Sequence, residues 1–359
     1  MRILFGAWLA LTTTLSAAQS AKVKKEAKHA ETSSKHGIKI PGVQIPFANL
    51  KAEAKLPLSP QWILFSDTVL IPNKTGGLER LDPKTNKLLD PIAGIANGCG
   101  GAIRAFSSLW IPTCDTHAVM RLDAKLAADP KAPTGRPGGR GAKPEADAKL
   151  AEPVKIDSGV GAAIPAIAAN PDSVWILSDD KTTLSRIDPD QNKVVSELRL
   201  PAGCNTLTFG ETALWVTCPL ENRILRINPD TTLIEKRIEV SGQPTALAIG
   251  ESSLWVLCLK EGKIERIDPK TNKVTRTIET GVVGSGTGAI AFGQGSLWVT
   301  LPSFPITRID PVSEKVVQQF FGPGGGAIQF GQGSVWLTNL NDGTLWRIDP
   351  KRIVATLAE

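Results

Sequence analysis

Two short phrases recur along the chain, and their spacing limits the possible folds more than any other feature. The first, Ser-Leu/Val-Trp-Val or a close variant, has its tryptophans 65, 40, 40, 43 and 38 residues apart; the second, Arg-Ile-Asp-Pro or a close variant, follows about ten residues later. The first phrase is marked by Trp110, Trp175, Trp215, Trp255, Trp298 and Trp336. The second begins at Arg80, Arg121, Arg186, Arg226, Arg266, Arg308 and Arg347. The second phrase therefore counts seven units, of which the first has lost its tryptophan.

Each unit has the pattern of four short strands. In the fifth unit, runs rich in Val, Ile and Thr cover 245–249, 254–258, 264–267 and 274–278, with Gly, Ser, Asn, Asp and Pro between them. Helical repeats of this length would need apolar residues three and four positions apart. Four strands in a period of about 40 residues are typical of a propeller blade. The pattern predicts an all-β fold, a seven-bladed β-propeller of four-stranded antiparallel blades, spanning residues 49–359.

The strand that completes the last blade has two candidates. Leu50–Leu58 resembles an outermost strand, and so does Arg352–Leu357 after the last Arg-Ile-Asp-Pro phrase. We favour the C-terminal segment for this position, with the N-terminal segment packed nearby.

The recurring residues have structural interpretations. A tryptophan repeated in nearly every blade is expected to pack between blades, because a ligand would touch only one face of the ring. In the Asp-Pro turns, Pro presets the backbone and Asp accepts hydrogen bonds from the following amides. Asn86, Asn192 and Asn272 suit left-handed turn positions, and ion pairing of the repeated Arg within or between blades is plausible.

The five cysteines predict two disulfides and one free thiol. Cys99 and Cys204 each precede a repeat tryptophan by 11 residues, while Cys114 and Cys218 follow it by four and three. The start of an innermost strand lies beside the end of the second strand, so we expect Cys99–Cys114 and Cys204–Cys218. Each would close a loop of about 15 residues, worth about 3 kcal/mol in the entropic description. Cys258 has Pro244 where its partner would be and is expected to be a buried free thiol.

The N-terminus predicts export. A charged start, an apolar run from Ile3 to about Leu15 and the small residues before a cleavage point near Ala18 are typical of a signal peptide, residues 1–18. A basic flexible leader is expected over 19–48. Export and paired cysteines together predict a periplasmic or secreted protein. The apolar run is shorter than the ~20 residues of a membrane-spanning helix, and no later run is apolar enough.

The formal charge of +6 does not lie on the predicted propeller. Arg2 contributes one positive charge, residues 19–40 contribute four and a Pro- and Gly-rich insertion at 124–152 contributes two, which leaves about −1 elsewhere. A nucleic-acid-binding fold carries a basic stripe, so no nucleic-acid partner is expected. The composition of 124–152 predicts a flexible excursion between the third and fourth strands of the second blade. We expect a monomer.

The two phrases resemble the YVTN-type bacterial propeller repeat and the related streptogramin (virginiamycin B) lyases, over roughly residues 50–359. The resemblance implies, for a lyase, two His and a Glu around a magnesium ion at the central mouth. This chain departs from that pattern, because His117 is the single histidine after residue 36. Gluconolactonase-type propellers hold a divalent cation with acids and Asn, and the loops before the innermost strands here contain no acids. We therefore expect no metal and no cofactor.

The residue types at the predicted mouth favour binding over catalysis. His117 and Asp115 share one hairpin loop, and Asn205, Gln243 and Thr287 lie in loops before innermost strands. These five are the candidate ligand contacts, and no catalytic residue is predicted. The expected function is a non-catalytic scaffold that binds a protein or small molecule at the mouth; the alternative is a streptogramin-lyase-like or gluconolactonase-like enzyme with a divergent site.

Overall fold

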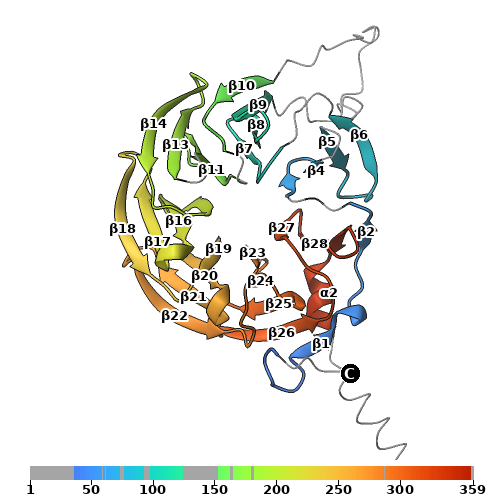
Figure 1. Ribbon diagram of the computed structural model, residues 1–359. Helices are drawn as coiled ribbons and strands as arrows, with labels where there is room; N and C mark the ends of the chain where they lie inside the picture. Colours follow the sequence, from blue (N-terminus) through green and yellow to red (C-terminus); the bar gives the residue numbers. More distant parts are fainter. Residues whose placement is uncertain are drawn as a thin grey trace, which may run out of the picture.

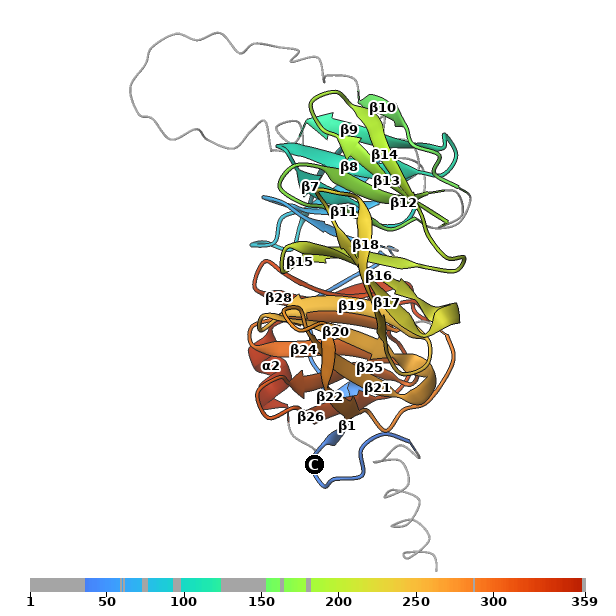
Figure 2. The ribbon, with the colours of Figure 1, turned by 90° about the vertical axis from the view of Figure 1, so that its left-hand side faces the viewer.

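The described residues of the computed structural model form seven sheets arranged around a central axis, as Figure 1 shows. This confirms the predicted seven-bladed β-propeller. The structure describes residues 36–58, 60, 62–72, 77–92, 98–123, 153–161, 165–178, 182–286 and 288–356. Figure 2 shows the blades of one half of the ring in succession, from β7–β10 to β26.

The first three blades each contain four antiparallel strands. Their strands are β3 (Leu64–Phe65), β4 (Val69–Pro72), β5 (Leu78–Leu81) and β6 (Leu88–Ile92); β7 (Ile103–Ala105), β8 (Ser108–Thr113), β9 (Ala118–Asp123) and β10 (Val154–Asp157); and β11 (Ile167–Ala169), β12 (Val174–Ser178), β13 (Thr183–Asp188) and β14 (Lys193–Arg199). The predicted insertion at 124–152 lies outside the described residues, and it joins β9 to β10, the third and fourth strands of blade two.

Blades four to six repeat the same order from the axis outward. Their strands are β15 (Thr206–Gly210), β16 (Ala213–Cys218), β17 (Arg223–Asn228) and β18 (Leu233–Glu239); β19 (Pro244–Gly250), β20 (Ser253–Cys258), β21 (Lys263–Asp268) and β22 (Lys273–Glu279); and β23 (Ala289–Gly293), β24 (Ser296–Leu301), β25 (Phe304–Asp310) and β26 (Lys315–Phe321). Short 3-10 helices, η4 (Pro219–Glu221) and η5 (Leu259–Glu261), follow the second strands of blades four and five. In blades three to six the pairing of the third and fourth strands shifts register at the Arg-Ile dipeptide. A β-bulge there increases the twist of the outer edge.

The repeat tryptophans pack between blades, as predicted. All six are at most 1% exposed. In five of them the indole N–H also donates to a backbone carbonyl five residues earlier, at the end of the preceding innermost strand; the acceptors are Ala105, Gly210, Gly250, Gly293 and Gly331. Trp175 instead donates to Asn170 Oδ1 at 2.9 Å. Each indole therefore fills an interblade space and fixes the first turn of its own blade.

Glycines at the ends of the innermost strands make room for the next blade. A Cβ at Gly250 would lie 2.1 Å from Phe292 Cγ, and one at Gly293 would lie 2.0 Å from Phe330 Cγ. Phe65 of blade one approaches Gly331 of blade seven in the same way. The ring therefore closes with the same aromatic-on-glycine contact that joins blade five to six and blade six to seven.

The last blade is completed by the N-terminal segment, so our preference for Arg352–Leu357 was wrong. Blade seven contains β27 (Ile328–Gly331), β28 (Ser334–Asn339) and β29 (Thr344–Ile348), and its outermost strand is β2 (Ala54–Leu56), antiparallel to β29. The expected C-terminal strand is instead largely helix α2 (Pro350–Ala355), whose N-cap Asp349 accepts a hydrogen bond from the Lys351 amide. The dipeptide Asp-Pro can start a helix as well as a turn, because Pro is favoured both at the first helical position and at the second position of a turn.

The segment before β2 also packs on the propeller. Strand β1 (Gln44–Pro46) pairs in parallel with β26 and gives blade six a fifth strand (Figure 1). Next comes η1 (Phe47–Asn49), where Phe47 stacks on Trp346 with ring centroids 4.8 Å apart. The expected boundary between leader and propeller, at residue 49, therefore lies inside an ordered strap that crosses from blade six to blade seven. Within the described part of the chain, no helix is long and apolar enough to cross a bilayer.

The Asp-Pro turns have the predicted local structure and an additional role between blades. Asp82, Asp188, Asp268 and Asp310 each accept a hydrogen bond from the amide two residues later. Asn86, Asn192 and Asn272 have φ between 54° and 58°. Each of these asparagines also accepts a hydrogen bond from the repeated Arg of the preceding blade, namely Arg347, Arg121 and Arg226. The sequence pointed to the turn but not to this contact.

Candidate functional site

The mouth face is the end of the ring where the chain passes from one blade to the next innermost strand. It also carries the hairpins that follow the second strands, since alternate connections of an antiparallel blade lie at the same end. We call the opposite end, with the Asp-Pro turns, the back face. His117, Asp115, Asn205, Gln243 and all five cysteines belong to loops or strand ends at the mouth face.

Both predicted disulfides are present in the structure. Cys99–Cys114 and Cys204–Cys218 have Cα atoms 5.8 Å and 4.0 Å apart, and each ties the loop before an innermost strand to the end of the second strand. Cys258 is buried without a disulfide partner, and Pro244 is its register partner in the adjacent strand, as predicted. Burial raises the pKa of the Cys258 thiol well above its ordinary value, with smaller contributions from Glu265 and Glu261. Such a thiol is a poor nucleophile.

Asn205 lies beside the blade-four disulfide, where its amide group organises the loop. Its Oδ1 accepts hydrogen bonds from Thr217 Oγ1 at 2.5 Å and Thr206 Oγ1 at 3.3 Å. Thr206 also donates to the Thr245 carbonyl of blade five at 3.0 Å. The side-chain carbonyl oxygen of Asn205 is therefore already hydrogen-bonded within the protein. The bond from Thr206 to Thr245 connects blades four and five at the mouth face.

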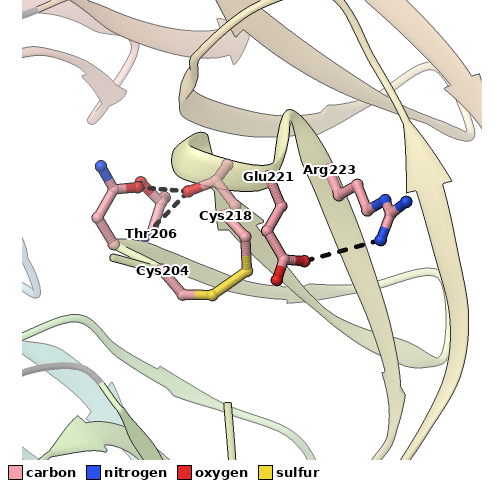
Figure 3. The surroundings of a disulfide bond; sticks show 7 residues. Cys204, Thr206, Cys218, Glu221 and Arg223 are labelled. Carbon is pink, nitrogen blue, oxygen red and sulfur yellow. Dashed lines mark hydrogen bonds and ion pairs between the residues drawn. A yellow bond between two sulfur atoms is a disulfide. The ribbon is translucent and has the colours of Figure 1, made fainter. Parts of the chain in front are cut away.

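The other side of the same disulfide carries an ion pair. Figure 3 shows Thr206 on one side of Cys204–Cys218 and Glu221 on the other, with Arg223 beyond it. Arg223 Nη1 lies 3.9 Å from Glu221 Oε2, and both side chains are more than a third exposed. Exposed pairs at this distance contribute little to stability. Their charges lie at the outer part of blade four rather than at the centre of the mouth.

His117 and Asp115 lie in the hairpin of blade two and are both exposed. His117 has a left-handed backbone (φ 53°), and its Nδ1 lies 2.7 Å from the Val160 carbonyl, in the loop that leads to blade three. The histidine therefore connects two neighbouring loops. Among the described residues, no hydrogen bond or ion pair joins His117 or Asp115 to the other candidates.

Gln243 is exposed in the loop before β19. Its backbone N–H donates to Asn222 Oδ1 at 3.0 Å, and its φ of 55° is left-handed. Thr287 lies outside the described residues. The candidates come from blades two, four, five and six, and His117, Asn205 and Gln243 do not line the mouth-face cavity described next.

A cavity of about 240 Å³ opens instead between blades six and seven at the mouth face. It is lined by Ser285, Thr300, Leu301, Pro302, Ser303, Gly324, Gly325 and Gly326. Two loops that precede innermost strands contribute to it, one through Ser285 and the other through Gly324–Gly326. None of the lining side chains is ionisable, so the cavity presents hydroxyl groups, apolar carbons and glycine backbone.

Asn339 shapes this cavity and was missed by sequence reasoning. It is 1% exposed, and its Oδ1 accepts a hydrogen bond from the Gly325 amide at 2.9 Å. Counted from the repeat tryptophan, Asn339 and Gly325 hold the positions of Cys218 and Cys204. A hydrogen bond in blade seven therefore replaces the disulfide of blade four, and aligning the two blades on Trp would have revealed it.

Solved structures of two lyases are among those that share this fold. The chain matches a structure described as streptogramin B lyase with a TM-score of 0.62 and 18% identity, covering 88% of this chain and 96% of that chain. It matches selenomethionine-substituted virginiamycin B lyase from Staphylococcus aureus with a TM-score of 0.64 and 17% identity, covering 82% of this chain and 97% of that one. At these identities the similarity concerns the fold. No family model and no curated protein sequence matches the chain.

The magnesium site implied by the resemblance to lyases does not fit the residues present. His117 is the single histidine of the propeller, and its Nδ1 is engaged with Val160. No carboxylate lines the mouth cavity, whereas hard cations need several oxygen ligands, usually including carboxylates. In the ranges that the structure describes, no three His, Cys, Asp or Glu residues lie close enough to hold a metal ion.

Proposed function

We propose that this protein is an exported, non-catalytic binding protein whose ligand is taken at the mouth face, in the cavity between blades six and seven. The composition of this cavity carries the proposal. Its polar groups are hydroxyls and backbone amides, which orient an uncharged polar ligand but supply neither a general base nor a strong nucleophile.

The size of the cavity restricts the ligand. Pockets that enclose a drug-sized molecule have volumes of roughly 300–1,000 Å³, and this one has about 240 Å³. The cavity suits one sugar unit or one uncharged side chain of a larger ligand that extends over the mouth. Paired cysteines and the predicted signal peptide support binding in the periplasm or outside the cell.

Calorimetric titration of the purified protein with neutral oligosaccharides and short uncharged peptides tests this proposal. We expect saturable 1:1 binding that is lost when Ser285→Trp fills the cavity from its exposed rim. Thr277→Trp, on the exposed outermost strand of blade five, is the matched control and should bind normally. Binding that survives in Ser285→Trp would place the ligand elsewhere.

The enzymatic alternative is tested in parallel with a streptogramin B antibiotic. Incubation with the protein and magnesium, followed by mass spectrometry and chromatography, would detect ring opening. We expect the antibiotic to be recovered intact. Turnover that depends on the protein would overturn the non-catalytic proposal.

A further inference from the structure

The repeated Arg of blades two, four and seven has the same set of partners on the back face. In blade two, Arg121 Nε donates to Ser108 of its own blade at 3.0 Å, and its guanidinium lies over Trp110. Its Nη1 reaches blade three, where the Pro189 carbonyl and Asn192 Oδ1 accept. At the junctions formed by Arg121, Arg226 and Arg347, the Asp-Pro turn of the next blade therefore fills the position in front of the guanidinium with oxygen acceptors.

Between blades five and six the same position holds a carboxylate. Glu314 occupies the place of the turn asparagine in blade six, with φ 56°. Its Oε1 lies 3.3 Å from Arg266 Nη1 and its Oε2 lies 2.7 Å from Arg276 Nε. At this junction a carboxylate between two cationic side chains takes the place of the turn asparagine as the acceptor for the repeated Arg.

Between blades six and seven no Asp-Pro turn faces Arg308, because the chain of blade seven continues into α2. Arg308 Nε donates to Ser296 at 3.2 Å and its Nη1 donates to Gln318 Oε1 at 3.2 Å, both within blade six. In front of it lies a cavity of about 280 Å³. The cavity is lined by Gln294, Ser296, Trp298, Arg308, Pro350, Lys351, Val354 and Ala355. Figure 1 shows α2 beside blades six and seven.

The charged groups around this cavity leave it electropositive. Arg308 and Lys351 are its two charged lining residues. Three carboxylates lie around it with partners of their own. Asp310 accepts from Val312 and Ser313 within its turn and also interacts electrostatically with Arg308. Asp349 caps α2, and Glu53 pairs with Arg352. Burial lowers the pKa of Arg308, and the Asp310 carboxylate offsets this effect only in part, so the protein compensates this cation incompletely.

We propose that this back-face cavity binds a small organic carboxylate, held between Arg308 and Lys351 with its apolar body against Pro350, Val354 and Ala355. The carboxylate takes the position that Glu314 occupies beside Arg266. Apolar carbons of α2 form the rest of the wall, so the ligand class is a monocarboxylate with a compact apolar or aromatic body. This site is separate from the mouth cavity and does not rest on the function proposed above.

Titration calorimetry with benzoate and benzamide tests the proposal on the full chain at pH 7 and low ionic strength. The two probes share the ring and differ in charge. We expect 1:1 binding of benzoate and at least tenfold weaker binding of benzamide. Lys351→Gln should weaken benzoate binding at least fivefold, and Val354→Trp, which fills the cavity from an exposed position, should abolish it.

Lys270→Gln is the matched control, because Lys270 follows Asp268-Pro269 as Lys351 follows Asp349-Pro350. It should bind benzoate normally, and so should the mouth variant Ser285→Trp. Absence of benzoate binding, equal binding of benzamide, or equal weakening by Lys270→Gln and Lys351→Gln would each overturn the proposal. Equally tight binding of acetate would overturn the role of the apolar wall.

Discussion

Arg347 Nη1 in the last blade donates to Asn86 Oδ1 in the first blade at 2.9 Å, across 261 residues of sequence. The same guanidinium donates to the Pro83 carbonyl and lies over the ring of Trp336. This contact is the one that Arg121 and Arg226 make at internal junctions. At this junction the side chains therefore join the blades in the same way as internally, in addition to β2, which completes blade seven and continues along the chain into blade one.

Asn86→Gly tests this closing contact. Glycine tolerates the left-handed backbone at this position, so the variant removes the acceptor with little effect on the turn. A hydrogen bond to a charged group contributes about 1.5–3 kcal/mol, and we expect a loss of about 1–2 kcal/mol in the free energy of unfolding because the Pro83 acceptor remains. Urea denaturation measures it. Lys87→Ala, an exposed change in the same turn, should have no effect; equal stability of the two variants would show that the contact contributes nothing.

Gly250→Ala tests the close approach of blades five and six. A Cβ here would lie 2.1 Å from Phe292 Cγ, within the backbone-to-aromatic contact that repeats around the ring. Overpacking of this kind costs about 1–3 kcal/mol, which a thermal unfolding scan would show as a lower Tm. Gly284→Ala meets only Pro302 Cγ at 3.5 Å and should be tolerated. The loss should shrink in the double variant Gly250→Ala/Phe292→Ala, and strict additivity would contradict the clash.

Pro244→Cys is expected to form a third disulfide. Pro244 and Cys258 are register partners between β19 and β20, at the positions of Cys204 and Cys218 in blade four. A cross-link here closes a loop like the existing ones and should stabilise the protein by about 3 kcal/mol in the entropic description. Thiol titration in denaturant should find no free thiol, compared with one in the natural protein. Pro244→Ser is the control, and two free thiols in Pro244→Cys would contradict the expected geometry.

The repeat predicted most of the fold because it fixes strand order and register together. Cys99–Cys114 and Cys204–Cys218 followed from counting positions relative to Trp. The closing strand did not follow, because the Asp349-Pro350 dipeptide and its first hydrogen bond are those of the turns: the Asp349 carboxylate accepts from Lys351 N at 2.8 Å, as Asp268 does from Lys270 N. Whether a turn or helix continues from there depends on tertiary packing.

The candidate site was harder to predict than the fold. Asn205, Gln243 and His117 are polar residues at the mouth face. In the structure, Asn205 Oδ1, the Gln243 backbone N–H and His117 Nδ1 each form a hydrogen bond within the protein. The local sequence pattern does not distinguish a polar side chain that hydrogen-bonds within the protein from one that contacts a ligand. The mouth cavity and the back-face cavity both lie where blade seven departs from the repeat. Such cavities depend on how neighbouring blades pack, which the sequence of one blade does not show.

Phe47→Ala tests whether the N-terminal strap is part of the propeller. Phe47 is buried, stacks on Trp346 and follows the strand that extends blade six. Phe→Ala substitutions in cores cost roughly 3–5 kcal/mol, and we expect about 3 kcal/mol because the site lies at the edge of the fold. Phe47→Leu should cost less than half as much. A change below about 1 kcal/mol in Phe47→Ala, measured by urea denaturation, would show that the strap docks without stabilising the ring.

The turn aspartates predict a loss of stability in acid. Hydrogen bonds from the Lys270 amide and Thr271 lower the pKa of Asp268 below its ordinary value of 3.8. A group with a lowered folded-state pKa stabilises the protein above its unfolded-state pKa, and this contribution is lost as the pH falls through the folded-state pKa. Asp268→Asn keeps an acceptor, as Asn228 does in blade four, but does not titrate. We therefore expect Asp268→Asn to resemble the natural protein at pH 7 and to lose less stability below pH 3.8, as followed by urea denaturation from pH 5 to pH 2. Asp115→Asn, which removes the same formal charge from an exposed mouth hairpin, is the control. If both variants follow the natural protein over the whole range, the Asp268 turn does not contribute to acid sensitivity.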